Sequence, residues 1–210
     1  MRSRAVVLAF VAAGVLFTLC IPAGASDTEA VYSYGGSFSL RIPADPSATK
    51  GWMQDAVVEV PLHLAIKDLD VSVDISHTNA FDLQLYLENP AGDAVQLNTS
   101  DPFEGFYKGA DYRSTTFDDE ASVSIADAQP PFEGRYRPLG SLAAFDNQDA
   151  CGLWKLQVYD AYYADTGSFH SFTLTITTPE PATAAFLLLG LGLLRRSRDN
   201  RRIVGATRAP

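Results

Sequence analysis

The chain has 210 residues, 47 % of them hydrophobic, and a net charge of −9 at neutral pH. Its segment 27–178 contains 8 Lys and Arg against 23 Asp and Glu, which gives this segment a net charge of −15. Such an acidic surface repels phosphate backbones, which excludes nucleic acid as a partner. Cys151 is the one cysteine of the segment, so no intramolecular disulfide is available, and the segment's length predicts one domain with a single core.

The N-terminus has the order of a secretory signal peptide. Two arginines precede an apolar stretch over residues 5–19, and Ala23 and Ala25 occupy the small-residue positions of a cleavage site. We therefore expect a signal peptide over 1–25, with a helical apolar part and cleavage after Ala25. The protein is predicted to be exported.

The segment 27–178 shows the period-two alternation of β-strands. Apolar residues alternate with polar ones in five runs, which are 69–75, 83–87, 95–97, 154–158 and 172–176. Clusters of Gly, Pro, Asn and Asp separate these runs, as expected for half-buried strands. Two stacked sheets that turn one face inward satisfy this pattern, which predicts an all-β fold, an antiparallel β-sandwich. Residues 100–140 are expected to form long loops with short strands.

A proline-rich break, an apolar run and a basic cluster follow this domain. They are Pro179-Glu180-Pro181, residues 182–194, and the pair Arg195 and Arg196. The order predicts a short C-terminal transmembrane-type helix, with the arginines on the cytoplasmic side and the preceding domain outside the membrane.

This C-terminal block resembles the PEP-CTERM sorting signal of bacteria that make extracellular polysaccharide. The resemblance covers residues 179–198 and leaves a tail over 199–210. It implies an exosortase-type enzyme that recognises Pro179-Glu180-Pro181 and removes the helix. It also implies a protein that is transiently anchored in the inner membrane, and that then resides in the periplasm, on the outer surface or in the extracellular matrix.

Several motifs between residues 40 and 177 resemble those of the P domain, also called P/Homo B. The motifs are Asp68–Thr78, Asp82–Gly92, Thr116–Ala121, Tyr136–Leu142, Gly152–Asp160 and Asp165–Leu174. The resemblance implies a jelly-roll-like sandwich over 27–178. In proprotein convertases this domain follows a subtilisin-like catalytic domain and stabilises it, so serine endopeptidase chemistry is associated with the family rather than with this segment.

The residues themselves indicate that the domain is not an enzyme. A serine peptidase needs a nucleophile, a histidine base and an orienting carboxylate. The candidate bases are His63, His77 and His170, and no G-x-S-x-G nucleophile motif occurs. His63 alternates with leucines in an expected strand, His77 is expected to bond a neighbouring loop, and His170 is expected at the surface.

Calcium is the metal that the acidic loops favour, because it takes six to eight oxygen ligands. The candidate ligands are Asp82, Asp118, Asp160 and Asp165, which lie at predicted loops that one end of the sandwich can bring together. The alternative is that these loops simply stay solvated. The scattered histidines and the single cysteine offer no spacing for zinc.

Loop aromatics suggest a recognition role. They are Phe103, Phe106, Tyr107, Tyr112, Tyr159, Tyr162 and Tyr163. Aromatic faces pack on sugar rings, so contact with extracellular polysaccharide is one interpretation, and cover over the sandwich end is the other. The sequence thus predicts a non-catalytic P-domain protein with a structural or adhesive role in the cell-surface or polysaccharide matrix. The alternative is an accessory partner of a separately encoded subtilisin-like protease at the cell surface.

Overall fold

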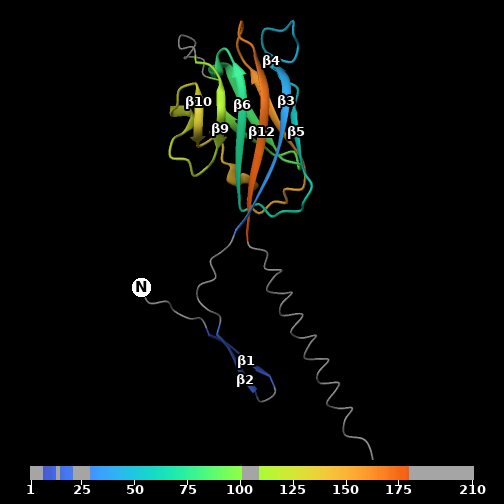
Figure 1. The fold of residues 1–210 in the computed structure, drawn as a ribbon, viewed down its shortest axis with the longest axis vertical. Helices are drawn as coiled ribbons and strands as arrows, with labels where there is room; N and C mark the ends of the chain where they lie inside the picture. Colours follow the sequence, from blue (N-terminus) through green and yellow to red (C-terminus); the bar gives the residue numbers. More distant parts are fainter. Residues whose placement is uncertain (1–6, 13–14, 21–28, 101–108, 180–210) are drawn as a thin grey trace, which may run out of the picture. The chain divides into compact units, whose positions relative to one another are not determined.

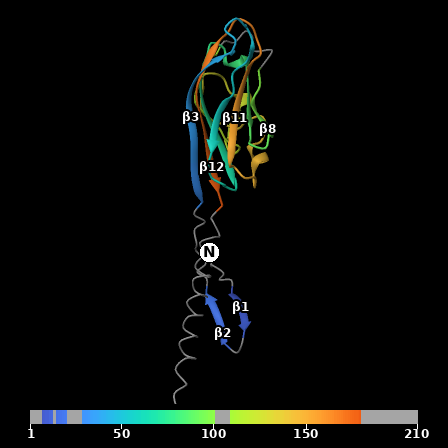
Figure 2. The ribbon, with the colours of Figure 1, turned by 90° about the vertical axis from the view of Figure 1, so that its right-hand side faces the viewer.

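The computed structural model describes residues 7–12, 15–20, 29–100 and 109–179. They divide into two compact units, of which the larger spans Ala30–Pro179. This larger unit is built from strands and loops, and its helical residues belong to short 3-10 turns (Figures 1 and 2). It lacks an α-helix among its described residues, which confirms the predicted all-β class.

The larger unit contains two five-stranded sheets. The first has the order β10 (Phe132–Tyr136), β9 (Tyr112–Phe117), β6 (Asp68–His77), β12 (Gly167–Thr178) and β3 (Ala30–Ile42). The second has the order β4 (Gly51–Trp52), β11 (Gly152–Asp160), β7 (Leu83–Glu88) and β8 (Ala94–Asn98), with β5 (Ala56–Val60) also paired to β11. In the view of Figure 1, the first sheet runs from β10 to β3.

One strand pair differs from the predicted antiparallel arrangement. Strands β9 and β10 pair in parallel. The connection over residues 118–131, which contains the 3-10 turn η2 (Ile125–Asp127), carries the chain back before β10 begins. A parallel pair requires a crossover of about a dozen residues or more, and this loop meets that length. The remaining pairs within both sheets are antiparallel.

The alternating residues form the core between the sheets. All apolar members of the four longer predicted runs are at most 2 % exposed. Trp154 of β11 is fully buried, donates its Nε1 hydrogen to the carbonyl of Ala150 and meets the ring of Phe145 edge-on, with 5.2 Å between ring centroids. Phe145 belongs to the 3-10 turn η3 (Leu142–Phe145). A buried indole with a bonded N–H combines a large apolar area with no unpaired donor, so Trp154 anchors the second sheet.

The N-terminal apolar stretch is not helical in its described part. Residues 7–12 and 15–20 form β1 (Val7–Ala12) and β2 (Val15–Cys20), which pair in antiparallel register. The prediction of a signal helix is therefore wrong for these residues. Valine and phenylalanine recur along both strands and favour the extended backbone, and Gly14 lies in the sequence between them.

The predicted cleavage residues Ala23 and Ala25 lie outside the described residues, as do Glu180, Pro181, Arg195 and Arg196 of the predicted sorting signal. The predicted C-terminal helix lies outside them as well. Within the described ranges, the structure has no helix with the length and hydrophobicity needed for a membrane span.

Candidate functional site

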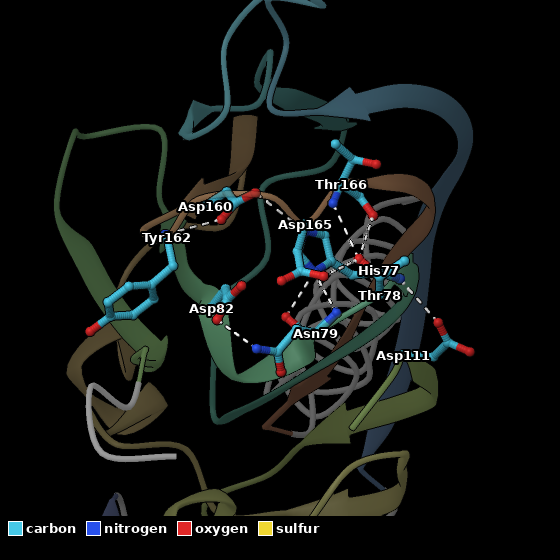
Figure 3. Close-up of polar contacts among 9 residues, drawn as sticks. All are labelled: His77, Thr78, Asn79, Asp82, Asp111, Asp160, Tyr162, Asp165 and Thr166. Carbon is cyan, nitrogen blue, oxygen red and sulfur yellow. Dashed lines mark hydrogen bonds and ion pairs between the residues drawn. The ribbon is translucent and has the colours of Figure 1, made fainter. Parts of the chain in front are cut away.

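His77 ends β6 and forms the centre of a buried polar cluster (Figure 3). Its Nδ1 lies 2.8 Å from the carbonyl oxygen of Asn79, and its Nε2 lies 3.3 Å from Oδ2 of Asp160 at the end of β11. The backbone N–H of His77 donates to Oδ1 of Asp111, 3.0 Å away. Both side chains of the His77–Asp160 pair are fully buried. Since β6 belongs to the first sheet and β11 to the second, this contact joins the two sheets at one end of the sandwich.

Three of the four predicted calcium ligands gather around this histidine. Asp82 belongs to the 3-10 turn η1 (Ala80–Asp82) and accepts a hydrogen bond from Nδ2 of Asn79 at 2.8 Å. Asp165 accepts one from the Thr78 hydroxyl at 2.7 Å. We refer to Asp82, Asp160 and Asp165 as the carboxylate cluster; Figure 3 shows its members around His77 and Asn79.

The carboxylate cluster contains a buried oxygen that no donor of the described residues satisfies. Oδ2 of Asp82 and Oδ1 of the neighbouring Asn79 are buried and accept no hydrogen bond from the described part of the chain, although a proton on Asp82 can be shared with Asp165. Burial raises the pKa of Asp82 to about 6, and the negative charges of Asp165 and Asp160 add to the increase. Asp82 therefore gains or loses its proton in a range where free aspartate is already ionised.

Asp118, the fourth predicted ligand, belongs to a different contact. Its Oδ2 accepts from Nε of Arg135 at 2.8 Å, and Nη2 of the same arginine donates to Asp70 at 2.8 Å. Although burial opposes the shift, the hydrogen bond from Arg135 holds the pKa of Asp118 below its usual range. The structure does not bring Asp118 together with the other three, because Phe117, the residue before it, pairs with Val71 near the start of β6, whereas His77 ends that strand.

The side chains of the carboxylate cluster are not arranged as metal ligands. As placed, no group of three or more His, Cys, Asp and Glu side chains in the described ranges is arranged to hold a metal ion. An ion at the carboxylate cluster would require these side chains to move. Calcium binding by Asp82, Asp160 and Asp165 stays a prediction.

The two other histidines lie at the surface. His63 lies in a loop rather than in the expected strand, and its Nδ1 is 2.6 Å from Oδ2 of Asp149. His170 is exposed, as predicted, and its Nε2 is 2.9 Å from Oγ of Ser76. That serine–histidine pair resembles two members of a catalytic triad, but no carboxylate of the described residues bonds the other nitrogen of His170. The pair lies on the outer face of the first sheet, where β6 and β12 run side by side.

The outer face of the second sheet presents a compact aromatic group. The ring of Trp52 lies 4.9 Å from that of Tyr159 and 6.1 Å from that of Tyr86, centroid to centroid. Trp52 is 52 % exposed, in contrast to the buried Trp154. The register explains the grouping, since Trp52 of β4 pairs with Tyr159 of β11, and Tyr159 pairs with Gln84 of β7.

Glutamines frame these rings. Gln157 of β11 pairs with Tyr86 of β7, which in turn pairs with Gln96 of β8. The Tyr86 hydroxyl accepts from Nε2 of Gln96 at 3.2 Å and donates to Oε1 of Gln84 at 3.1 Å. We call the six side chains the aromatic face; its members are Trp52, Tyr86, Tyr159, Gln84, Gln96 and Gln157.

The sequence profile of the proprotein convertase P-domain family matches residues 66–176, more than half of the 210 residues. The chain belongs to the proprotein convertase P-domain family. This P domain includes both His77 and the carboxylate cluster within the matched range. The described residues contain the P-domain sandwich and no catalytic domain beside it. No curated protein matches the sequence.

Three solved structures resemble this P domain in part. The serine protease of Aeromonas sobria shares 16 % identity, both alone and in its complex with the chaperone ORF2, with a TM-score of 0.42 in each case. The match covers 72 % of this chain and 28 % of the protease for the complex, and 71 % and 27 % for the protease alone. The chain thus spans less than a third of that protease. The structure of the Gt strain of infectious bursal disease virus has 14 % identity, with coverage of 83 % and 38 % and a TM-score of 0.33.

Sequence reasoning located the aromatic side chains of the P domain only in part. Tyr112, expected in an exposed loop, is fully buried in β9, and its hydroxyl accepts from Nδ2 of Asn98 at 2.7 Å. Phe103, Phe106 and Tyr107 lie outside the described residues. Trp52 was missed because its two-residue strand has no alternation to reveal it. The signal that does reveal the aromatic face is polar: Gln84, Tyr86, Gln157 and Tyr159 occupy outward positions of their strands.

Proposed function

We propose that this chain is an exported, non-catalytic P-domain protein with a structural and adhesive role in the bacterial cell surface or exopolysaccharide matrix. The observation that carries the proposal is the aromatic face, where the half-exposed Trp52 lies against Tyr159 and Tyr86 on the outer side of the second sheet. Exposed Trp and Tyr on a rigid sheet are characteristic of recognition surfaces. The order of the terminal segments in the sequence supports export and sorting.

The contacts of the three histidines support a non-catalytic role. His77 is buried between Asn79 and Asp160, His63 pairs with Asp149, and His170 has only a serine as its side-chain partner among the described residues. A general base needs both a substrate proton within reach and an orienting group. His77 has a carboxylate partner but is fully buried, and His170 is exposed but has no carboxylate partner among the described residues. His63 is exposed and has Asp149 as its partner, but no Ser or Cys side chain of the described residues bonds its ring, so a triad is not assembled at any of the three.

The sorting step is tested by replacing Pro179-Glu180-Pro181 with three alanines. Exosortase-type processing would be blocked, so the variant is expected to remain in the membrane fraction at full size. Fractionation and immunoblotting of cells that carry an exosortase gene measure this, with surface labelling of intact cells as a second readout. Wild-type and variant protein of identical size and location would contradict the proposal.

A second candidate is an accessory role beside a separately encoded subtilisin-like protease, which membership in the P-domain family favours. In that case the full chain is expected to lengthen the half-life of such a protease at elevated temperature, because a stabilising partner binds the native state alone. Residual peptidase activity over time, with and without the chain, measures the effect. An unchanged half-life would leave the matrix role as the proposal.

A further inference from the structure

We propose that the aromatic face binds a neutral polysaccharide, with sugar rings stacked on Trp52, Tyr159 and Tyr86 and their hydroxyl groups bonded to the surrounding glutamines. This inference rests on the proposed matrix role and names its ligand class. It begins with the geometry of the rings. The rings of Trp52 and Tyr159 are tilted by 51° at 4.9 Å, so they form a small angled platform rather than a stack closed on itself.

The platform lies on a rigid support. Trp52 and Tyr159 are cross-strand partners, and the backbone of Met53, the next residue, donates to the carbonyl of Val158 at 2.8 Å. The inward neighbours of Tyr159 and Tyr86 on their strands are fully buried core residues, Val158 and Leu85. Since these side chains are held before any ligand arrives, little conformational entropy is lost on binding.

The polar atoms around the rings are arranged for hydroxyl groups. Gln157 donates through Nε2 to Glu88, and Gln96 donates through Nε2 to Tyr86, so in both glutamines the amide orientation is fixed. Their Oε1 atoms, the Tyr159 hydroxyl and the Nε1 hydrogen of Trp52 have no hydrogen-bond partner within the described part of the chain. A surface that combines apolar rings with a few fixed donors and acceptors suits a polyhydroxylated ring, whose faces are apolar and whose rim is polar.

The charge distribution disfavours a charged partner at the aromatic face. The segment 27–178 carries −15, yet the aromatic face has no ionised side chain, and the nearby Lys155 and Glu88 neutralise each other at 2.6 Å. The outer face of the first sheet is different, because Asp68, Asp70 and Asp74 occupy outward positions of β6. A polyanion is repelled by the domain as a whole, and a cationic partner is attracted to the acidic sheet instead. An uncharged polysaccharide meets neither effect at the aromatic face.

The test is native affinity electrophoresis of the full chain in gels that contain a neutral polysaccharide. The probes are hydroxyethyl cellulose, galactomannan and dextran, with alginate as the polyanion. At least one neutral probe is expected to retard the wild type, whereas alginate is not. Trp52→Ala is expected to weaken the affinity about tenfold or more, since truncating a central aromatic anchor removes most of the stacking contact. Trp52→Phe, which keeps a ring, is expected to lose less.

Leu153→Ala is the matched control. Leu153 is 53 % exposed, close to the 52 % of Trp52, and it lies on the same outer face but at the other end of β11, opposite Glu59. The Leu153→Ala variant is expected to bind the neutral polysaccharide like the wild type. The thermal melts of all variants are expected to coincide, because both substituted side chains are exposed. If Trp52→Ala and Leu153→Ala weakened the affinity for the polysaccharide equally, the binding would be a nonspecific contact with exposed apolar side chains, and the proposal would be overturned.

Other outcomes also overturn it. These are retardation by none of the neutral probes, retardation by alginate alone, and capture of a subtilisin-like protease that Trp52→Ala abolishes while no glycan competes. Surface labelling separates this failure from a failure of the proposed function. A chain that reaches the cell surface but binds no glycan retains the proposed location and loses only the ligand.

Discussion

Among single residues, Asp82 is expected to control how the stability of the domain depends on pH. Burial raises the pKa of its carboxyl to about 6 from 3.8, with Asp165 and Asp160 adding to the increase and His77 opposing it. The folded state therefore holds this proton more tightly than the unfolded chain. The stabilisation is full below about pH 4 and is lost as the pH rises through about 6, where the buried carboxylate becomes charged.

Asp82→Asn is predicted to flatten this dependence. The amide stays neutral at every pH, and its oxygen still accepts from Asn79, while its N–H₂ supplies a donor between the carboxylates. We expect the variant to gain about 1 kcal/mol at pH 7.5, a figure reduced for solvent screening. Urea melts of the full chain between pH 4 and 8 measure it.

Asp127→Asn serves as the control, because this carboxylate is exposed in η2 and lies outside the carboxylate cluster. Its stability curve should run parallel to that of the wild type. If the curve of Asp82→Asn also runs parallel to the wild type, the carboxyl of Asp82 does not change its protonation on folding, and the proposed linkage is absent.

Between elements, the close approach of β12 to β6 depends on Gly167. A Cβ added there would meet the carbonyl oxygen of Ser76 and, at 2.5 Å, Cδ2 of His77. Neither atom is the free end of a flexible side chain. The glycine that follows Asp165 and Thr166 thus permits the register in which Gly167 pairs with His77.

Gly167→Ala is predicted to destabilise the domain by about 2–3 kcal/mol, because the added methyl group must displace the backbone or the His77 ring. Guanidinium melts of the full chain give the change, and the matched control is Gly36→Ala in β3. A Cβ at Gly36 would meet side-chain atoms, namely ring carbons of Phe38 at 3.1 and 3.2 Å and Cγ2 of Val58 at 3.8 Å, and a side chain yields more readily than a backbone. Equal effects of both changes would show that loss of glycine, rather than the close approach, is responsible.

For the whole molecule, the sequence determined strand faces far better than strand neighbours. Alternation identified the inward side of Leu85 and Val158, because burial is a local property that repeats every second residue. The positions of Trp52 and Asp118 depended on which strands pair and on an arginine some seventeen residues away in β10, which no local pattern encodes. The sequence could place Asp82, Asp160 and Asp165 at one end of the sandwich, because each lies where a strand begins or ends at that end.

The last prediction concerns cations and the domain's excess of acidic residues. At −15, the segment 27–178 suffers self-repulsion that any salt screens, so sodium alone is expected to raise the melting temperature. Calcium is expected to raise it further. A divalent ion bound by Asp82, Asp160 and Asp165 together would take the place of the proton on Asp82, whose pKa is raised to about 6. Because the three carboxylates lie together only in the folded state, the ion would bind the folded state alone. Such binding contributes about 2.7 kcal/mol at a hundredfold excess over Kd.

Thermal melts of the full chain in chelator, calcium, magnesium and sodium at matched ionic strength separate the two effects. The calcium-specific increment should disappear in Asp82→Asn and persist in Asp118→Asn, because Asp118 is engaged by Arg135 and lies outside the cluster. Asp118→Asn lowers the starting stability by breaking that ion pair, so each variant is compared with itself in chelator. Equal increments in all salts for the wild type would mean that screening accounts for the whole effect, and that the carboxylate cluster does not bind calcium.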